Sequence, residues 1–180
     1  MGIRRSIREY AGLPPKKFTQ ALSYAISKTS SQPKVGKTLL YKIMYFADFD
    51  FYELNEILLT GEKYRSITHG PAPVHFDKAI AALKASGEIR EARVGNGPYV
   101  QVKYESLKDP DVPELSDEEK AHMDKVVQRL SRMTATGVSK YVHKDLPVKA
   151  TKPGELINPE LVFYRDEDFS VRTYPNDSSE

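Results

Sequence analysis

Apolar residues recur at helical spacing in the first third of the chain. The first such run follows Pro14 and Pro15, and proline is tolerated in the first turn of a helix. The second run extends from about Val35 to Leu54 and is apolar around much of its circumference, which predicts a helix central to the core. One face of this helix holds Leu39, Leu40, Ile43, Met44, Ala47 and Phe51, and a neighbouring stripe holds Tyr41, Tyr45, Asp48 and Tyr52.

The middle of the chain alternates between turns and short regular elements. Residues 55–71 contain two turn signals with glycine and predict a non-helical excursion. A third helix is expected from Pro73 to Gly87, where the glycine suits a helix C-terminus. Two runs with β-propensity, at 89–94 and 99–104, are joined by a glycine-rich link and predict a β-hairpin.

The last third of the chain predicts further helices followed by shorter elements. Ser116 and Glu119 form a capping-box sequence, which marks the start of a helix. A short helix is expected from about Thr136 to Lys144, and residues 161–164 fit either a strand or a helical turn. The whole pattern predicts a mainly α, compact domain of about five to six helices with a small β-hairpin.

Length and charge predict one domain with differently charged ends. A chain of 180 residues has the size of a single domain, which we place at residues 14–165, between a basic arm at 1–13 and an acidic tail at 166–180. Residues 1–45 hold nine Lys or Arg and one acidic residue, whereas the rest of the chain holds 18 basic and 24 acidic residues. The basic front end fits an acidic partner, either nucleic acid or protein, and equally fits a solvated arm.

Residue types that the chain lacks narrow its possible functions. It contains no cysteine, which excludes disulfides, cysteine-ligated zinc and a thiol nucleophile. No stretch approaches the ~20 apolar residues that a membrane helix needs. The basic start is not followed by an apolar signal core. We therefore expect a soluble, cytoplasmic protein with no membrane partner.

Motifs for catalysis are incomplete. Gly36-Lys37-Thr38 matches the end of a Walker A loop, but that motif also needs a glycine where Ser31 stands and a preceding strand. The four histidines form no zinc-binding pattern, and no serine lies in a Gly-x-Ser-x-Gly elbow. His69 precedes Gly-Pro in a turn and could lie in a pocket, although a structural role fits it better. We expect no enzymatic activity, no metal and no cofactor.

A helix, Gly87 and a hairpin follow one another in the order found in winged-helix domains. In such domains the helix reads the major groove and the wing contacts phosphates. Here the expected helix carries only Lys78 and Lys84 as basic residues, and the tip of the hairpin carries none. A winged-helix-like middle part used as a protein scaffold is therefore the better interpretation, and nucleic acid is an unlikely partner. A DNA-binding transcriptional regulator remains the alternative function.

Five segments together carry a family resemblance. In order and spacing they resemble the Panacea domain family, the SocA-like antitoxins, over roughly residues 18–157. The segments are Lys37–Asp48, Leu59–Tyr64, His69–Pro73, Leu115–Glu119 and His143–Lys149.

The resemblance implies a non-enzymatic antitoxin of a toxin–antitoxin pair, with a place in phage defence. Such proteins neutralise a cognate toxin encoded nearby, generally by direct binding, and some deliver it to a protease. The toxins of the family include enzymes that resemble alarmone synthetases. The tyrosine stripe offers suitable anchors, because tyrosine combines a large contact area with a hydrogen-bonding group. The expected partner-binding residues are Tyr41, Tyr45, Asp48, Tyr52, Tyr64 and His69, with Tyr41 nearest the apolar face.

Overall fold

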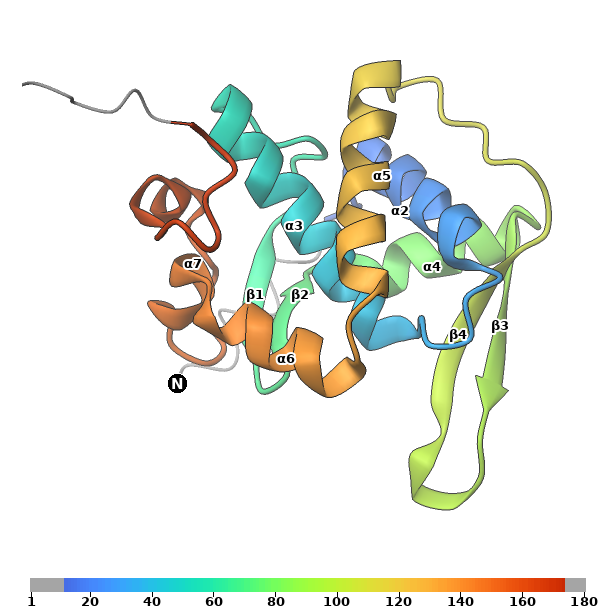
Figure 1. Cartoon of the computed structure of the whole chain (residues 1–180). Helices are drawn as coiled ribbons and strands as arrows, with labels where there is room; N and C mark the ends of the chain where they lie inside the picture. The colour runs from blue at the N-terminus through green and yellow to red at the C-terminus, as the bar shows by residue number, and fades with distance from the viewer. Residues whose placement is uncertain (1–11, 174–180) are drawn as a thin grey trace, which may run out of the picture.

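One long helix, α3 (Lys37–Asn55), runs through the middle of the molecule (Figure 1). The structure is a computed structural model that describes residues 12–173. Within that range α3 contacts α2 (Lys16–Thr29), α5 (Asp117–Ser131), α6 (Ala135–Lys144) and a strand of each hairpin. Because neighbours surround α3, most of its circumference is buried, as its nearly continuous apolar sequence predicts.

The ends of α3 and α5 have clear local causes. The chain leaves α3 at Glu56, which adopts the left-handed conformation (φ 58°) and donates its N–H to the carbonyl of Tyr52 at 2.7 Å. At the start of α5 the hydroxyl of Ser116 accepts the N–H of Glu119 at 3.1 Å, and the Glu119 carboxylate accepts the N–H of Ser116 at 3.0 Å. This reciprocal pair is the capping box that the sequence predicts.

The excursion between α3 and the next helix contains an antiparallel hairpin of β1 (Tyr64–Ile67) and β2 (Gly70–Pro73). The sequence predicts only turns here, because β2 contains two prolines. β1 also bonds to the segment 154–157 on its other side, so β2 is the edge strand, where proline is tolerated. The following helix, α4 (Phe76–Ala85), begins three residues later than expected because Pro73 belongs to β2.

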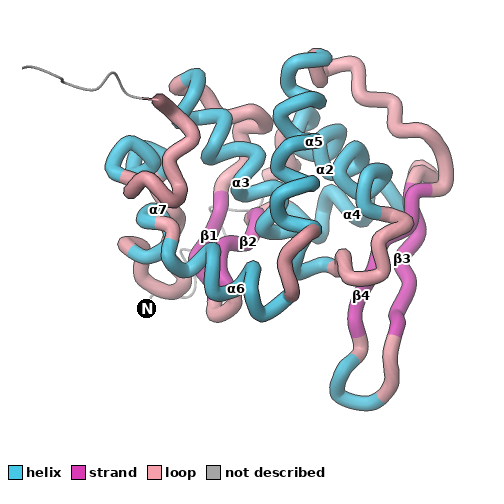
Figure 2. The backbone as a smooth tube through the Cα atoms, in the orientation of Figure 1, coloured by secondary structure: helices cyan, strands magenta, loops and turns pink. Residues whose placement is uncertain are grey.

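A second hairpin projects from the body of the molecule (Figures 1 and 2). Its strands, β3 (Ile89–Val94) and β4 (Gln101–Ser106), pair in antiparallel register. A single 3-10 turn, η1 (Gly97–Tyr99), forms the tip. The predicted order of helix, glycine and hairpin is thus present, and the mainly α class with small hairpins is confirmed.

The C-terminal part wraps back onto the central helix. It contains α7 (Leu146–Lys149), which the sequence does not predict, and η2 (Pro159–Tyr164), so the element expected at 161–164 is a helical turn. Beyond η2 the chain continues to pack: Phe169 is buried, and the N–H of Val171 donates to a carboxylate of α3. Residues 166–173 of the expected acidic tail therefore lie on the domain. The rest of that tail and residues 1–11 of the basic arm lie outside the described residues.

A buried ionic cluster fastens this C-terminal part to α3. The guanidinium of Arg165, fully enclosed, donates to Asp50 at 2.8 Å and to Glu53 at 2.9 Å. It also forms a two-pronged pair with Asp145, at 2.9 and 2.7 Å. Arg129 of α5 supplies a further bond to Asp50 at 2.8 Å. One arginine thus joins three carboxylates from α3 and the α6–α7 junction. None of the helices in the described range is long and apolar enough to cross a membrane.

Candidate binding groove

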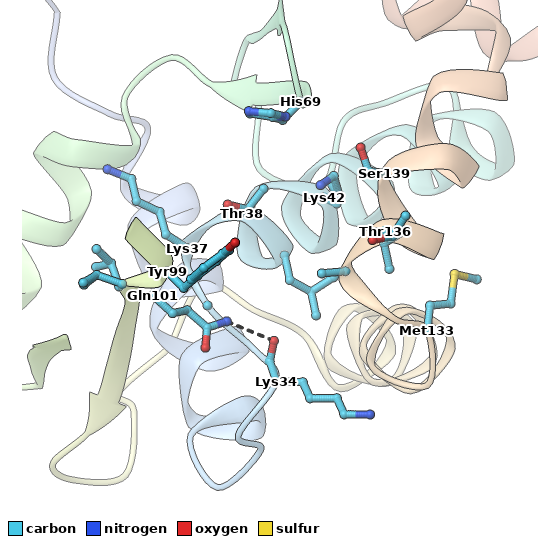
Figure 3. A pocket seen from close by; sticks show the side chains of 16 residues that line it. Lys34, Lys37, Thr38, Lys42, His69, Tyr99, Gln101, Met133, Thr136 and Ser139 are labelled. Carbon is cyan, nitrogen blue, oxygen red and sulfur yellow. Dashed lines mark hydrogen bonds between the residues drawn. The ribbon is translucent and has the colours of Figure 1, made fainter. Parts of the chain in front are cut away.

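An open groove of about 800 Å³ lies between three elements (Figure 3). The first turn of α3 forms one side, the first turns of α6 form another, and the tip of the β3–β4 hairpin forms the rim. Gly36, just before α3, lets the hairpin approach, since a Cβ there would lie 2.6 Å from the side chain of Gln101. Gln101 in turn donates to the carbonyl of Lys34 at 3.3 Å.

The charged side chains of the groove are basic. Lys34 and His69 are exposed at its edge, and Lys37 pairs with the exposed carboxylate of Asp77 at 2.9 Å. Lys42 differs because it is buried at 3% exposure, and this burial lowers the pKa of its ammonium group. The groove therefore combines two lysines at its edge, Lys34 and Lys37, with one enclosed lysine in its wall.

Gly70 allows the close packing around Lys42. Its φ of 117° is a conformation that only glycine adopts freely. A Cβ at this position would lie 2.9 Å from Val142 and 3.6 Å from the Cε of Lys42. The aliphatic stem of Lys42 is thus held between α3, β2 and α6, which leaves its position well defined.

The rim of the groove is apolar and exposed. Tyr99 is 85% exposed and Val100 is 45% exposed, both at the hairpin tip. Val94, on the opposite strand, is 51% exposed. Exposed apolar side chains that gather at one protruding point are typical of a protein interaction site.

Three of the expected partner-binding residues lie in the interior. Tyr45 is fully buried and donates its hydroxyl to Asp145 at 2.8 Å. Tyr64 is also buried and donates to Asp48 at 2.6 Å. Asp48 additionally accepts the N–H and the hydroxyl of Thr60, at 2.6 and 2.5 Å. These side chains stabilise the packing of α3 and present no surface to a partner in this structure.

Burial changes the acid–base properties of this interior group. It raises the pKa values of Tyr45 and Tyr64 well above 10. Burial also raises the pKa of Asp48 to about 6, although the hydrogen bonds from Thr60 and Tyr64 oppose the shift. The carboxyl group of Asp48 therefore loses its proton near pH 6, about two pH units above an exposed aspartate.

The other three expected residues are partly or fully accessible. Tyr41 is half-buried, edge-on to Phe76 with ring centroids 4.7 Å apart. It lines a small cavity of about 200 Å³ together with His69, and this cavity shares Lys37 and Thr38 with the larger groove. Tyr52 lies at the far end of α3 against Phe163. The structure thus brings Tyr41 and His69 together beside the groove and places Tyr52 elsewhere.

The groove contains two residues that sequence reasoning missed, Lys42 and Tyr99. The only local signal for Lys42 is a charge inside an apolar helical run. Tyr99 lies within a predicted strand, where an aromatic residue normally indicates burial. The near-Walker sequence Gly36-Lys37-Thr38 opens α3, and the segment before it is a turn after a helix rather than a strand. Among residues 12–173 no group of three or more potential ligands is placed to hold a metal ion.

The element that resembles a winged helix keeps its lysines engaged. Lys78 of α4 donates to the carbonyl of Gly12 at 2.7 Å, and Lys84 pairs with Glu91 at 2.9 Å. The hairpin tip carries no Lys or Arg. DNA recognition through this element gains no support from the structure.

The raised pKa of Asp48 predicts a specific pH dependence of stability. Between about pH 4 and 6 the folded state holds a proton on Asp48 that the unfolded state has lost, so this group favours folding less as the pH rises. The shift corresponds to about 3 kcal/mol. Urea unfolding of wild type and of Asp48→Asn at pH 4 to 7 isolates the contribution of this carboxyl group to the free energy of unfolding. We expect the stability of wild type relative to the variant to fall from pH 4 to 6 and then level off. A constant or rising difference would contradict the assignment.

The arrangement defines a class of protein: a mainly α domain with a protruding hairpin and a groove whose charged lining residues are basic. Residues 40–147, more than half of the chain, match the family model described as Antitoxin SocA-like, Panacea domain. The chain therefore belongs to the SocA-like antitoxin family, which the sequence resemblance predicts. No match was found among curated proteins or solved structures.

Proposed function

We propose that this chain neutralises a cognate toxin by binding it directly, with the β3–β4 tip as the principal contact. Family membership supports an antitoxin-type role. The observation that carries the mode of action is the exposure of Tyr99, Val100 and Val94 at a point that projects from the domain. A large aromatic residue surrounded by smaller apolar ones is a common energetic centre of protein interfaces.

The contact surface extends from the tip along the groove. Tyr41 and His69 line the adjoining small cavity, and Lys34 and Lys37 lie at the groove's edge. This surface is basic, so an acidic face on the toxin would complement it. A standard interface buries about 800 Å² on each partner, which is more than the tip alone offers, so a toxin would cover part of the groove rim as well.

The mechanism that we propose is steric rather than enzymatic. The antitoxin covers the working surface of the toxin in the cytoplasm and holds it there. A toxin enzyme of the alarmone-synthetase type would be blocked in this way if its substrate site were covered. Delivery of the toxin to a protease is the second route by which a family member could act, and it also begins with binding.

Co-expression with the protein encoded by the adjacent gene tests the proposal. We expect the neighbour alone to stop growth, the pair to restore it, and the two proteins to co-elute in size-exclusion chromatography with light scattering. Rescue without a complex would contradict direct neutralisation and favour transcriptional control. A complex that forms while toxin levels fall, and whose rescue depends on a host protease, would identify delivery for degradation. A neighbour that is not toxic and does not bind would contradict the toxin-binding role.

A further inference from the structure

The wall of the groove contains a buried cation without a counter-charge. Lys42 is 97% buried, and its side chain lines the groove between α3 and α6 (Figure 3). Among residues 12–173 its ammonium group has no hydrogen bond and no ion pair. The stem of Lys42 is enclosed, whereas its Nζ is not among the fully enclosed polar atoms and so faces the groove. An anion in the groove would supply the counter-charge that this ammonium group lacks.

Two helix N-termini border the same space. Gly36, Lys37 and Thr38 from the start of α3 line the groove, and so do Ala135 and Thr136 from the start of α6. The first turn of a helix carries backbone N–H groups without intrahelical partners and the positive end of the helix dipole. No side chain caps α3 at Gly36, so these donors are open to a ligand. At the start of α6 the hydroxyl of Thr134 already accepts the N–H of Gly137 at 2.9 Å, so the open donors that favour an anion here are chiefly those of α3.

Uncommitted hydroxyl groups complete the polar part of the groove. Thr38, Thr136 and Ser139 line it, and Figure 3 shows them around Lys42. Their hydroxyls make no hydrogen bond to any residue between 12 and 173. The lining contains no Asp or Glu. Several donors around a volume much larger than one carboxylate match a group with several anionic oxygens, such as a chain of phosphates.

Part of the lining of the groove is apolar or aromatic. Val100, Val102 and Met133 line it. Figure 3 shows Tyr99 near Lys37 and Thr38, with Met133 across the groove beside Thr136. An exposed tyrosine ring can stack on a nucleobase, as aromatic side chains do in proteins that bind single strands. The groove thus offers cations and hydroxyls that suit phosphates and an exposed ring that suits a flat base.

We propose that the groove binds a nucleotide, with its phosphates at Lys42 between the first turns of α3 and α6 and its base against Tyr99. Such a site would share Tyr99 and the rim of the groove with the proposed toxin contact. Nucleotide binding is measured on the isolated chain, without a toxin. If no nucleotide binds, the proposed toxin contact is unaffected, and if no toxin binds, the nucleotide site is unaffected.

Isothermal titration of the purified chain with ATP and with tripolyphosphate is the direct test. We expect both probes to bind and Lys42→Met to weaken both by about tenfold or more, because a hydrogen bond to a charged group is worth roughly 1.5–3 kcal/mol. Tyr99→Ala should weaken ATP only. Lys125→Met, at an exposed position on α5, is the matched control and should leave both affinities within about twofold.

A second variant separates binding from folding. Thr136 is exposed, and an acidic residue in the first turn of a helix is compatible with folding, so Thr136→Asp should keep the thermal melt of wild type and abolish binding of both probes. Absence of ATP and tripolyphosphate binding at millimolar concentration would overturn the proposal. Equal losses in Lys42→Met and Lys125→Met would also overturn it, as would polyglutamate that binds as tightly as ATP, which would mark the groove as a site for acidic peptides.

Discussion

Replacing Arg165 with methionine should lower the free energy of unfolding by about 3–5 kcal/mol, the range for breaking a buried ion pair by removing one partner. The guanidinium is fully enclosed and bonds to Asp50, Glu53 and Asp145. Methionine fills much of the volume but leaves these carboxylates without their shared cation. The loss should therefore come from uncompensated buried charge rather than from a cavity. Urea unfolding, followed by circular dichroism, measures it.

A matched arginine provides the control for this prediction. Arg90 pairs with Glu105 on the exposed hairpin, so Arg90→Met should change stability by less than about 1 kcal/mol. Adding Glu53→Gln to Arg165→Met should recover part of the loss, because Arg165 is the cation that pairs with Glu53 and one unpaired charge then disappears. If Arg165→Met costs no more than Arg90→Met, the cluster does not fasten the C-terminal part to α3.

Tyr99→Ala should weaken rescue of growth from the toxin while leaving the fold intact. Because this side chain is 85% exposed and has few contacts of its own to lose, its removal should not change the melting temperature measurably. A central aromatic anchor of an interface typically costs at least ~2 kcal/mol when truncated to alanine, or roughly 30-fold in Kd. Growth of the co-expressing strain and co-elution of the two proteins give the readout.

Tyr164 offers a control of the same residue type. It is 75% exposed but lies on η2, away from the hairpin. Tyr164→Ala should therefore rescue as wild type does. If Tyr164→Ala fails and Tyr99→Ala succeeds, the contact lies on the C-terminal face, where Tyr52 packs against Phe163.

The sequence predicted the elements whose ends are fixed by nearby residues, such as caps and turns. The capping box at Ser116 and Glu119 sets the start of α5 as expected, and the glycine-rich link forms the tip of the second hairpin. The β1–β2 hairpin escaped prediction because prolines disfavour strands. Its stability depends on the segment near Leu156, about 90 residues away along the chain. The order of residues 166–173 likewise depends on Glu53, a distant residue on α3.

The binding residues were harder to predict than the fold for a physical reason. Helical periodicity places Tyr45 and Asp48 on a stripe beside the apolar face. At such a border position a side chain can be either buried or exposed, and the sequence pattern does not distinguish the two. The structure buries them because their partners, Asp145 and Thr60, come from other elements. Lys42 was missed for a different reason: a lysine in an apolar run normally extends its ammonium group to solvent, so its enclosure is not expected. Only the close approach of β2 and α6 reveals that it is enclosed.

The most direct test of the central claim is the affinity between the purified antitoxin and the protein encoded beside it. Cell-free synthesis of that protein avoids its toxicity, and biolayer interferometry gives the dissociation constant. We expect a Kd on the order of 10 nM for wild type, as near-complete capture at micromolar levels requires, and binding at least about 30-fold weaker for Tyr99→Ala. Growth rescue in cells without measurable binding of the purified pair would contradict direct neutralisation by this chain.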